Sequence, residues 1–352
     1  MELLSVTMND GVKPRSEIEG KDNSSEDKSN YKIVRKGDMV YNSMRMWQGA
    51  NGISPCDGIV SPAYTVLMPK QEINNGYFAA LFKSANLINE FRKNSQGMTS
   101  DTWNLKYPQI ETIKVQIPSV SEQDKVSEMF SALDERIAAQ SRLVESLKKY
   151  KRGLLSQLIA QKKAFDTSGE WKTVKLGHIF KERTERAKGN ETLLAVTISN
   201  GVQRRDEIDL KDNSSDDKSN YKCVYIGDIA YNTMRMWQGA SGVSPYNGIV
   251  SPAYTIVTPI RPDLHNMTFW AYYFKYSPLV QTFQKYSQGL TSDTWNLKFP
   301  QFSEIAVTMP PISEQDKIAE CLSVFDEHCK CEDEKLQALL QVRTSLLQQL
   351  FI

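Results

Sequence analysis

The chain has 352 residues, of which 40% are hydrophobic and 24% are charged, a composition typical of globular proteins. No stretch approaches the roughly 20 apolar residues of a membrane span, and no signal-peptide pattern opens the chain, so we expect a cytoplasmic protein whose five cysteines are free thiols. The formal net charge of +1 provides no overall attraction to nucleic acid, so any DNA binding must come from local basic groups or from partners.

The first part of the chain is rich in Gly, Pro, Ser, Asn and aromatic residues, with short apolar runs such as GDMVYNSM, GIVSPAYTVL and IKVQIP. These runs predict strands separated by tight turns. One helix is predicted over Tyr77–Arg92, because apolar residues recur on one face. We interpret this face as core, and it consists of Phe78, Leu81, Phe82, Ile88 and Phe91.

A long helix is predicted over Ser121–Gln161. Ser121 is its expected N-cap, and Asp124 follows at the position of a capping box. Apolar residues then alternate at spacings of four and three, which is the heptad seam of a coiled coil. Gln140 and Lys151 interrupt the seam, and polar residues at such positions can fix the register. The seam residues are Val126, Phe130, Leu133, Ile137, Val144, Leu147, Leu154 and Leu158.

Most of this sequence is then repeated. Residues 2–69 align without gaps on residues 192–259, with 44 of 68 positions identical, and the later parts align at an offset of 192. The second copy therefore predicts a helix over Ser313–Phe351, with Glu332 and Arg343 as the counterparts of Gln140 and Lys151. Its start repeats Ser121 and Asp124 as Ser313 and Asp316, its seam is Ile318, Leu322, Phe325, Cys329, Leu336, Leu339, Leu346 and Leu350, and its shorter helix repeats the core face as Phe269, Trp270, Tyr273, Phe274 and Val280.

The two long helices are expected to bury their apolar seams against each other. Two equivalent units joined in one chain can do this by folding back, so that the helices run antiparallel. The fold class is therefore predicted as α+β, with two mixed α/β modules related by pseudo-two-fold symmetry and joined by two long antiparallel coiled-coil helices. The predicted domains are a first module at 1–119, a first helix at 120–161, a second module at 162–311 and a second helix at 312–352. Residues 160–190 have no counterpart in the first copy, so the first module is expected to lack its opening strand.

Several motifs in this layout are informative together. Each long helix begins with a Pro-containing run followed by Glu-Gln, in IPSVSEQDKV and MPPISEQDKI, and the second module opens with EWKTVKLGHIF, a Trp-x-x-Val-x-Leu-Gly pattern. The runs GDMVYNSMRMWQG and GIVSPAY lie within the modules. In this order, and across essentially the whole chain, these motifs resemble the specificity subunit of type I restriction–modification systems.

This resemblance implies two target-recognition domains that bind the two halves of a split site in double-stranded DNA. It also implies two methylation subunits, which methylate adenine with S-adenosylmethionine, and restriction subunits that cleave unmethylated DNA. The sequence itself contains no Gly-rich loop for S-adenosylmethionine, no D/N-P-P-Y/F motif and no phosphate-binding loop. We therefore expect a non-catalytic subunit without cofactor, metal site or membrane partner.

Three polar stretches that occur in both copies carry the side chains suited to DNA reading. Arg pairs with guanine and Asn or Gln with adenine, whereas Lys, Ser and Thr suit phosphates. The candidate residues are Lys21, Asn23, Lys28, Arg45, Trp47, Gln48, Gln96, Thr99, Ser100, Thr102 and Lys106 in the first copy, and Lys211, Asn213, Lys218, Arg235, Trp237, Gln238, Gln288, Thr291, Ser292, Thr294 and Lys298 in the second.

Each stretch also has a purely structural interpretation. The stretch around Lys28 could be a solvated loop, Arg45 and Trp47 could form a cation–π pair that braces a hairpin, and the Ser-Asp-Thr run could be a turn that stabilises itself. The basic run of Lys148, Lys149, Lys151 and Arg152 is interpreted as a solvated or partner-facing helix surface.

Two other functions compete with the restriction–modification interpretation. One is a tandem protein-interaction scaffold without a DNA target, and the other is a single-chain enzyme, against which the missing motifs argue. Because the polar stretches are nearly identical in the two copies, the expected DNA target is an interrupted, nearly palindromic sequence. Because the net charge is +1, the isolated chain is expected to bind DNA weakly.

Overall fold

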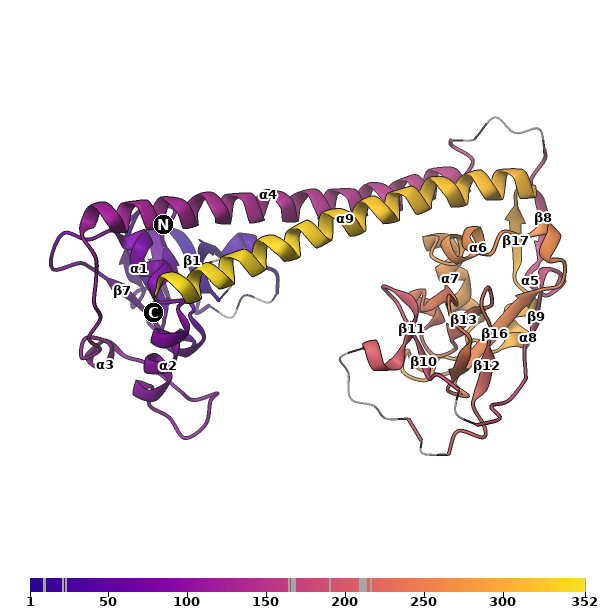
Figure 1. The fold of residues 1–352 in the computed structure, drawn as a ribbon, viewed down its shortest axis with the longest axis horizontal. Coiled ribbons are helices and arrows are strands. Elements are labelled where there is room, and N and C mark those ends of the chain that lie inside the picture. The colour runs from indigo at the N-terminus through magenta and orange to yellow at the C-terminus, as the bar shows by residue number, and fades with distance from the viewer. Residues whose placement is uncertain are drawn as a thin grey trace. The chain divides into compact units, whose positions relative to one another are not determined.

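The structure is a computed structural model that describes residues 1–8, 11–20, 22, 24–163, 165, 169–189, 191–208, 214–215 and 217–351. The chain divides into two compact units, one made of Met1–Leu143 with Glu332–Ile352 and the other of Val144–Cys331. Each unit holds one globular module and a part of each of two long helices, α4 (Val120–Ile159) and α9 (Ile312–Leu350) (Figure 1). The predicted α+β fold with two long helices is confirmed.

The first module is built on two small sheets. One sheet has the strand order β2-β1-β6-β3, in which β1 and β6 are parallel, and the other has the antiparallel order β5-β4-β7. Several of the strands begin or end at Gly, Pro or Asn residues, which favour turns. Their bounds are β1 (Glu2–Thr7), β2 (Gly11–Pro14), β3 (Lys32–Val34), β4 (Met39–Asn42), β5 (Asn51–Ile53), β6 (Gly58–Val60) and β7 (Tyr64–Leu67), with two 3₁₀ turns, η1 (Arg15–Glu17) and η2 (Met46–Gln48).

The helix predicted over Tyr77–Arg92 is in fact two helices, α1 (Asn75–Leu81) and α2 (Ala85–Asn94). Ser84 divides them, because its hydroxyl accepts the backbone N–H of Leu87 and so caps the start of α2. Four residues of the predicted core face, Phe78, Leu81, Phe82 and Phe91, do pack into the core of this unit, whereas Ile88 is partly buried outside it. A short helix, α3 (Tyr107–Ile110), completes the first module.

The second module repeats this arrangement and adds three elements at its start. Its central sheet has the order β14-β13-β16-β9, and β8 pairs with β17. Its core is dominated by aromatic rings, among which Trp270 and Phe302 are fully buried. The bounds are β8 (Lys172–Lys175), α5 (Leu176–Ile179), β9 (Phe180–Glu182), β10 (Leu194–Thr197), β11 (Gly201–Arg204), η3 (Arg205–Glu207), β12 (Lys222–Val224), β13 (Ile229–Asn232), η4 (Met236–Gln238), β14 (Ser241–Val243), β15 (Gly248–Val250), β16 (Tyr254–Pro259), η5 (Pro262–Leu264), α6 (Met267–Tyr273), α7 (Ser277–Tyr286), α8 (Phe299–Ser303) and β17 (Ala306–Met309).

One predicted strand of the first module does not form. The run IKVQIP, residues 113–118, is not part of a sheet, whereas its counterpart β17 pairs with β8. In the part of the chain that the structure describes, no strand pairs with this run. A strand-forming sequence without a neighbouring strand gains no ladder hydrogen bonds, which explains the difference.

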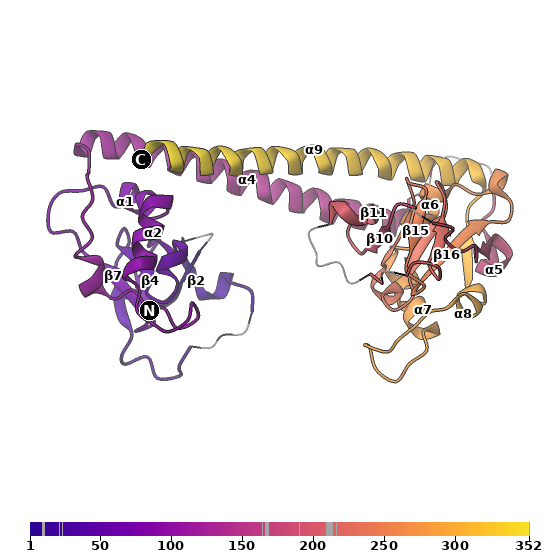
Figure 2. The same ribbon diagram turned by 60° about the horizontal axis from the view of Figure 1, so that its bottom comes forward.

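Within each unit, α9 runs antiparallel beside α4 (Figures 1 and 2). In the first unit the Arg343 guanidinium bonds the Asp134 carboxylate, and in the second unit the Lys151 amine bonds the Asp326 carboxylate. These two ion pairs are counterparts at the offset of 192. Lys151, from the basic run, thus has a structural partner on the facing helix.

The ends of the long helices differ from the prediction in two details. Both helices begin one residue before the predicted N-caps, at Val120 and Ile312, so Ser121 and Ser313 lie inside the first turn. At the other end of α9, Leu350 is 46% exposed and Phe351 takes its place in the core. Phe351 packs there because its ring lies against Phe130 and Tyr77.

The Gln-Asp part of each helix start holds the neighbouring module. In the first unit, Gln123 accepts the backbone N–H of Asn74 and Asp124 accepts its side-chain amide. Asn74 in turn caps α1 by accepting the N–H of Tyr77. Asn266 makes the same bonds in the second unit. Asp124 and Asp316 therefore fix the module on the helix rather than forming a capping box.

Candidate nucleic-acid interface

The turn η2 presents the first group of candidate residues. Met46 is buried below the turn, and Gly49 ends it with φ of 80°, a left-handed conformation that favours glycine. The Trp47 indole N–H donates to the carbonyl of Met44, which fixes the ring at the surface. Arg45 projects from the turn and is exposed. The turn η4 repeats this geometry, with the Trp237 N–H on Met234 and Arg235 exposed.

A loop over residues 96–105 presents the second group. Gln96 and Asn104 exchange two backbone hydrogen bonds of 3.0 and 2.8 Å, which close the loop at its base. At its far end, the Thr102 hydroxyl donates to the Thr99 carbonyl and accepts the Thr99 N–H. The counterparts Gln288, Asn296, Thr291 and Thr294 form the same loop in the second module. The predicted self-stabilised turn is therefore present, and its exposed backbone is held in one shape.

The turn and the loop meet through two tryptophans. Trp47 and Trp103 pack edge to face with ring centroids 5.1 Å apart, and Trp237 and Trp295 do so at 5.2 Å. Two candidate stretches that are about 50 residues apart in the sequence thus form one surface in each module. We call these surfaces the first and second loop clusters. The first consists of Arg45, Trp47, Gln48, Gln96, Thr99, Ser100, Thr102 and Lys106, and the second of Arg235, Trp237, Gln238, Gln288, Thr291, Ser292, Thr294 and Lys298.

The loop clusters differ in one cation. In the first module, the Arg92 guanidinium lies over the Trp103 ring at 5.4 Å. The corresponding position in the second module is Gln284. In the described part of the chain, the cation–π contact of this region therefore involves Arg92 rather than the predicted Arg45. Arg45 and Arg235 remain at the surface, where their guanidinium groups can meet a ligand.

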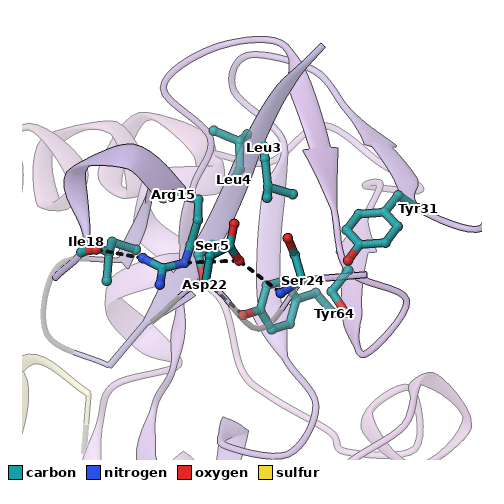
Figure 3. Close-up of a pocket in the computed structure, with 10 residues that line it drawn as sticks. Leu3, Leu4, Ser5, Arg15, Ile18, Asp22, Ser24, Tyr31 and Tyr64 are labelled. Atoms are coloured by element: carbon teal, nitrogen blue, oxygen red, sulfur yellow. Dashed lines mark hydrogen bonds and ion pairs between the residues drawn. The ribbon is translucent and has the colours of Figure 1, made fainter. Parts of the chain in front are cut away.

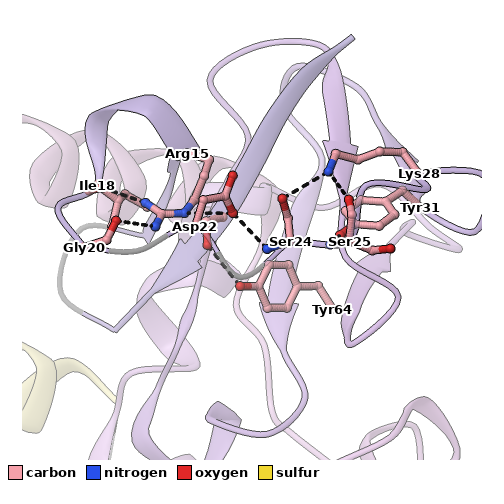
Figure 4. Close-up of polar contacts among 10 residues, drawn as sticks. Arg15, Ile18, Gly20, Asp22, Ser24, Ser25, Lys28, Tyr31 and Tyr64 are labelled. Carbon is pink, nitrogen blue, oxygen red and sulfur yellow. Dashed lines mark hydrogen bonds and ion pairs between the residues drawn. The ribbon is translucent and has the colours of Figure 1, made fainter.

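Lys28 and Lys218 lie in a different environment. The Lys28 amine donates to the Ser24 hydroxyl and the Ser25 carbonyl and lies over the Tyr31 ring (Figure 4). Lys218 makes the corresponding contacts with Ser214, Ser215 and Tyr221. Each lysine thus braces its own loop, as in the structural interpretation of this stretch. The candidates Lys21, Asn23, Lys211 and Asn213 lie outside the described residues.

A pocket of about 360 Å³ lies beside the Lys28 loop (Figure 3). Its polar groups bind one another: Arg15 donates to the carbonyls of Ile18 and Gly20 and lies 3.6 Å from the Asp22 carboxylate. The backbone N–H of Ser24 donates to Asp22, and this hydrogen bond is the main reason that the pKa of Asp22 is below its ordinary value. The pocket therefore resembles a braced loop more than a reaction centre.

The structure also reveals an exposed apolar residue at the tip of each loop, which was not among the candidates. Met98 is 99% exposed and its counterpart Leu290 is 100% exposed. A fully exposed apolar side chain has no role in the core, and its recurrence at the same position of both modules makes it a candidate contact residue. The signal in the sequence was a large apolar residue inside an otherwise polar loop, QGMTSD or QGLTSD.

The described residues were also considered for a metal site and for a membrane-spanning helix, and they support neither. Among them, no group of three or more His, Cys, Asp or Glu side chains could hold a metal ion. Within the same ranges, every helix is too short or too polar to cross a membrane.

Comparison with known proteins agrees with the doubled architecture. The chain matches the type I restriction modification DNA specificity domain over residues 5–149 and again over residues 168–341. It is also similar in fold to the S subunit of a type I restriction–modification system from M. genitalium, with a TM-score of 0.56, 15% identity and coverage of 91% of this chain and 84% of that one. A chain from a structure on complex assembly and conformational transition of the type I R-M system gives a TM-score of 0.55, 16% identity and coverage of 92% and 83%. The chain therefore belongs to the family of type I restriction–modification DNA specificity proteins, and its two modules are DNA specificity domains.

Proposed function

We propose that each loop cluster reads one half of a split, nearly palindromic DNA site. The observation that carries this proposal is the presence of the same exposed side chains in the same local geometry in both modules. Equal side chains on equal scaffolds prefer equal bases. Because α4 and α9 run antiparallel, the two modules are expected to read opposite strands, as dimeric proteins do on palindromic operators.

The chemistry of the loop clusters suits this role. Arg45 can pair with the O6 and N7 atoms of guanine, and Gln48 or Gln96 with the N6 and N7 atoms of adenine. Lys106 and the hydroxyls of the loop suit phosphate oxygens. Met98 at the loop tip can contact a thymine methyl group or enter between base steps. The same roles fall to Arg235, Gln238, Gln288, Lys298 and Leu290.

Small differences between the modules provide the departures from a perfect palindrome. Arg92 opposite Gln284 changes the charge beside one loop cluster. Arg35 opposite Tyr225 and Cys56 opposite Tyr246 are further differences. Each is expected to alter preference at a single base rather than to redirect a whole half-site.

We further propose that catalysis resides in other subunits. Two methylation subunits would dock on this chain, bind S-adenosylmethionine and modify adenine, and restriction subunits would join them to cleave unmethylated DNA. A net charge of +1 neutralises few phosphates, so tight DNA binding is expected only with the methylation subunits present.

Methylome sequencing of cells that carry this chain with its methylation subunits tests the proposal. The expected motif is a half-site, a fixed spacer and the reverse complement of that half-site. Arg45→Ala should relax one half and Arg235→Ala the other, with about 1–3 kcal/mol lost at the affected base pair. Lys93→Ala, at an exposed residue outside the loop cluster, is the control.

Three outcomes would count against the proposal. Two unrelated half-sites would contradict the palindrome. An unchanged motif in both arginine variants would contradict the assignment of the loop clusters. If the chain bound its partners but the complex showed no preference among DNA sequences, a protein-interaction scaffold would be the better description.

A further inference from the structure

The hairpin of β10 and β11 ends in an exposed turn that is held in one shape. Ile198, Ser199 and Asn200 form this turn, and all three residues are exposed. The Thr197 hydroxyl accepts the backbone N–H of Asn200 at 3.1 Å. Gly201 closes the turn with a φ of 65°, a left-handed conformation that favours glycine. We call residues 198–200 the hairpin turn, and it lies outside the three stretches that the sequence singled out.

The hairpin turn is a neighbour of the second loop cluster. The backbone of Gly242, in β14, lies so close to that of Gly201 that an added Cβ on Gly242 would be 2.8 Å from the Gly201 Cα. Strand β14 follows η4 directly in the chain. Arg235 and Gln238 of the second loop cluster are exposed at η4. The hairpin turn therefore stands beside residues that are already candidates for reading DNA.

One lysine joins the hairpin turn to η4. The Lys275 amine donates to the carbonyl of Ile198 at 2.7 Å and to the carbonyl of Gly239, which ends η4, at 3.1 Å. Burial of this amine lowers the pKa of Lys275 to about 8. Taking an amine out of water is costly unless it is hydrogen-bonded, and the two carbonyls supply these bonds. Lys275 thus fixes the position of one turn relative to the other.

The first copy keeps this lysine but has a different residue in the turn. Lys83 is the counterpart of Lys275, and its Cγ would lie 3.6 Å from a Cβ added to Gly49, which ends η2. Asn200, in contrast, stands where the first copy has Asp10, a residue outside the described ranges. A constant buried lysine and a variable exposed residue suit a support and a specificity residue, respectively.

We propose that the hairpin turn is a third DNA-reading element of the second module, in which Asn200 reads an adenine and Lys275 is the positioning residue. The proposal rests on the proposed function of the second loop cluster. An Asn side chain can pair with the N6 and N7 atoms of adenine in the major groove. Ile198, which is 49% exposed on the same turn, can lie against a thymine methyl group. The second half-site then contains a base pair that the hairpin turn reads and the loop cluster does not.

Binding to single-base variants of the target tests the role of Asn200. The complex of the chain with its methylation subunits is measured against the methylome motif and against every single base-pair substitution of it. Asn200→Ala should reduce the preference for an A·T pair at one position about tenfold, the value of one good bidentate contact. The position that Arg235→Ala relaxes should be a different one. Lys285→Ala, at an exposed residue of α7, is the control and should leave every base preference unchanged.

A second substitution changes the preference instead of removing it. Asn200→Asp gives the second module the residue that the first copy has in its sequence. A carboxylate accepts a hydrogen bond from the N4 amine of cytosine, so the preference at the same position should move from adenine towards cytosine. Both Asn200 variants alter only an exposed side chain, so they test the hairpin turn in a chain that keeps its fold.

A double-mutant cycle separates positioning from a general structural role of Lys275. Lys275→Met should weaken the preference at the position that Asn200 reads. Combining it with Asn200→Ala should cause no further loss of preference at that position. A lysine that only stabilises the module would instead lower binding to matched and mismatched DNA alike, which leaves their ratio unchanged.

The outcomes distinguish this proposal from the proposed function. If both Asn200 variants keep every base preference while Arg235→Ala still relaxes its base pair, the hairpin turn does not read DNA and the loop cluster does. If Arg235→Ala and both Asn200 variants all keep the original preferences, the loop cluster fails as well. Equal loss of binding to matched and mismatched DNA in Lys275→Met would overturn its assignment as a positioning residue.

Discussion

The Gln140 side-chain amide donates to the backbone carbonyl of Glu332 at 2.9 Å and to its carboxylate at 2.7 Å. Both residues are buried, and each is the counterpart of the other in the duplicated sequence. Two of the four predicted interruptions of the apolar seams therefore meet in one pair. A shift of one helix along the other would break both of these hydrogen bonds between buried groups, so the pair favours a single register.

Gln140→Leu should lower the free energy of unfolding by about 1–3 kcal/mol, because Glu332 loses its amide donor while it stays buried. Gln140→Leu with Glu332→Leu should recover most of that loss, since both polar partners are then replaced by apolar groups. Urea unfolding of the two single variants and the double variant measures the coupling. Asp134→Asn, which removes a half-exposed ion pair with Arg343, should cost about 1 kcal/mol or less and is the control. A double variant as unstable as the sum of the single variants would contradict this role.

Lys275 ties the turn between β10 and β11 to the turn η4, because its amine donates to the carbonyls of Ile198 and Gly239. Burial, together with the nearby Lys151 charge, lowers the pKa of Lys275 to about 8. Between this value and the ordinary lysine pKa of 10.5, the unfolded chain binds more protons than the folded chain. The contribution of this group to the free energy of unfolding should therefore rise with pH in that window, by at most about 1.4 kcal/mol per pH unit.

Comparison with Lys275→Met isolates this effect from other groups that titrate at high pH. The difference in unfolding free energy between the wild type and the variant should increase in favour of the wild type from about pH 8 to about pH 10. It should be constant below that range, where the lysine is charged in both the folded and the unfolded chain. A difference that does not change with pH would show that Lys275 keeps an ordinary pKa.

The duplication allowed the main features of the fold to be predicted from the sequence. The seams, their matched polar interruptions and the antiparallel pairing follow from residues that recur at a fixed offset. The division between α1 and α2 was missed, because apolar residues continue through Phe82 and the capping bond of Ser84 is a local detail that periodicity does not register. Residues 113–117 are unpaired because no strand of the described residues lies beside them, and such a long-range relationship is not visible in a local pattern.

Only part of the candidate site could be predicted from the sequence. Arg45 and the loop over residues 96–105 were recognised as separate stretches by their residue types. That they form one surface depends on the contact between Trp47 and Trp103. Such a contact joins residues that are far apart in sequence, so composition and spacing do not predict it. Lys28 illustrates the opposite case, because its charge suggested a phosphate contact and the fold gives the amine partners within its own loop.

Gly97→Ala should impair the first half-site alone. Gly97 has φ of +145°, and an added Cβ would lie 2.6 Å from the Thr102 carbonyl oxygen, so the loop must change shape. Gly289→Ala should do the same for the second half-site, where the contact with Thr294 is 2.5 Å. Gly37→Ala is the matched control, because its φ is also positive at +92° but nothing lies within 4 Å of the added carbon. Methylome sequencing reads each half-site separately, and equal relaxation of both half-sites by one variant would refute the division of labour.

The apolar side chains at the loop tips are expected to contact DNA. Met98 and Leu290 stand in water, so Met98→Ser and Leu290→Ser should leave the unfolding free energy unchanged. If each side chain is buried against DNA, its loss should cost up to about 1.5–3 kcal/mol of binding free energy, because that is the value of burying a Met or Leu side chain.

Binding of the target by the complex with methylation subunits, measured over a range of salt concentrations, tests this. The dependence on salt should not change in these variants, since no phosphate contact is removed, whereas Lys106→Ala should reduce the slope by about one unit. Undiminished affinity in both tip variants would show that the tips face solvent or a partner protein in the assembled complex.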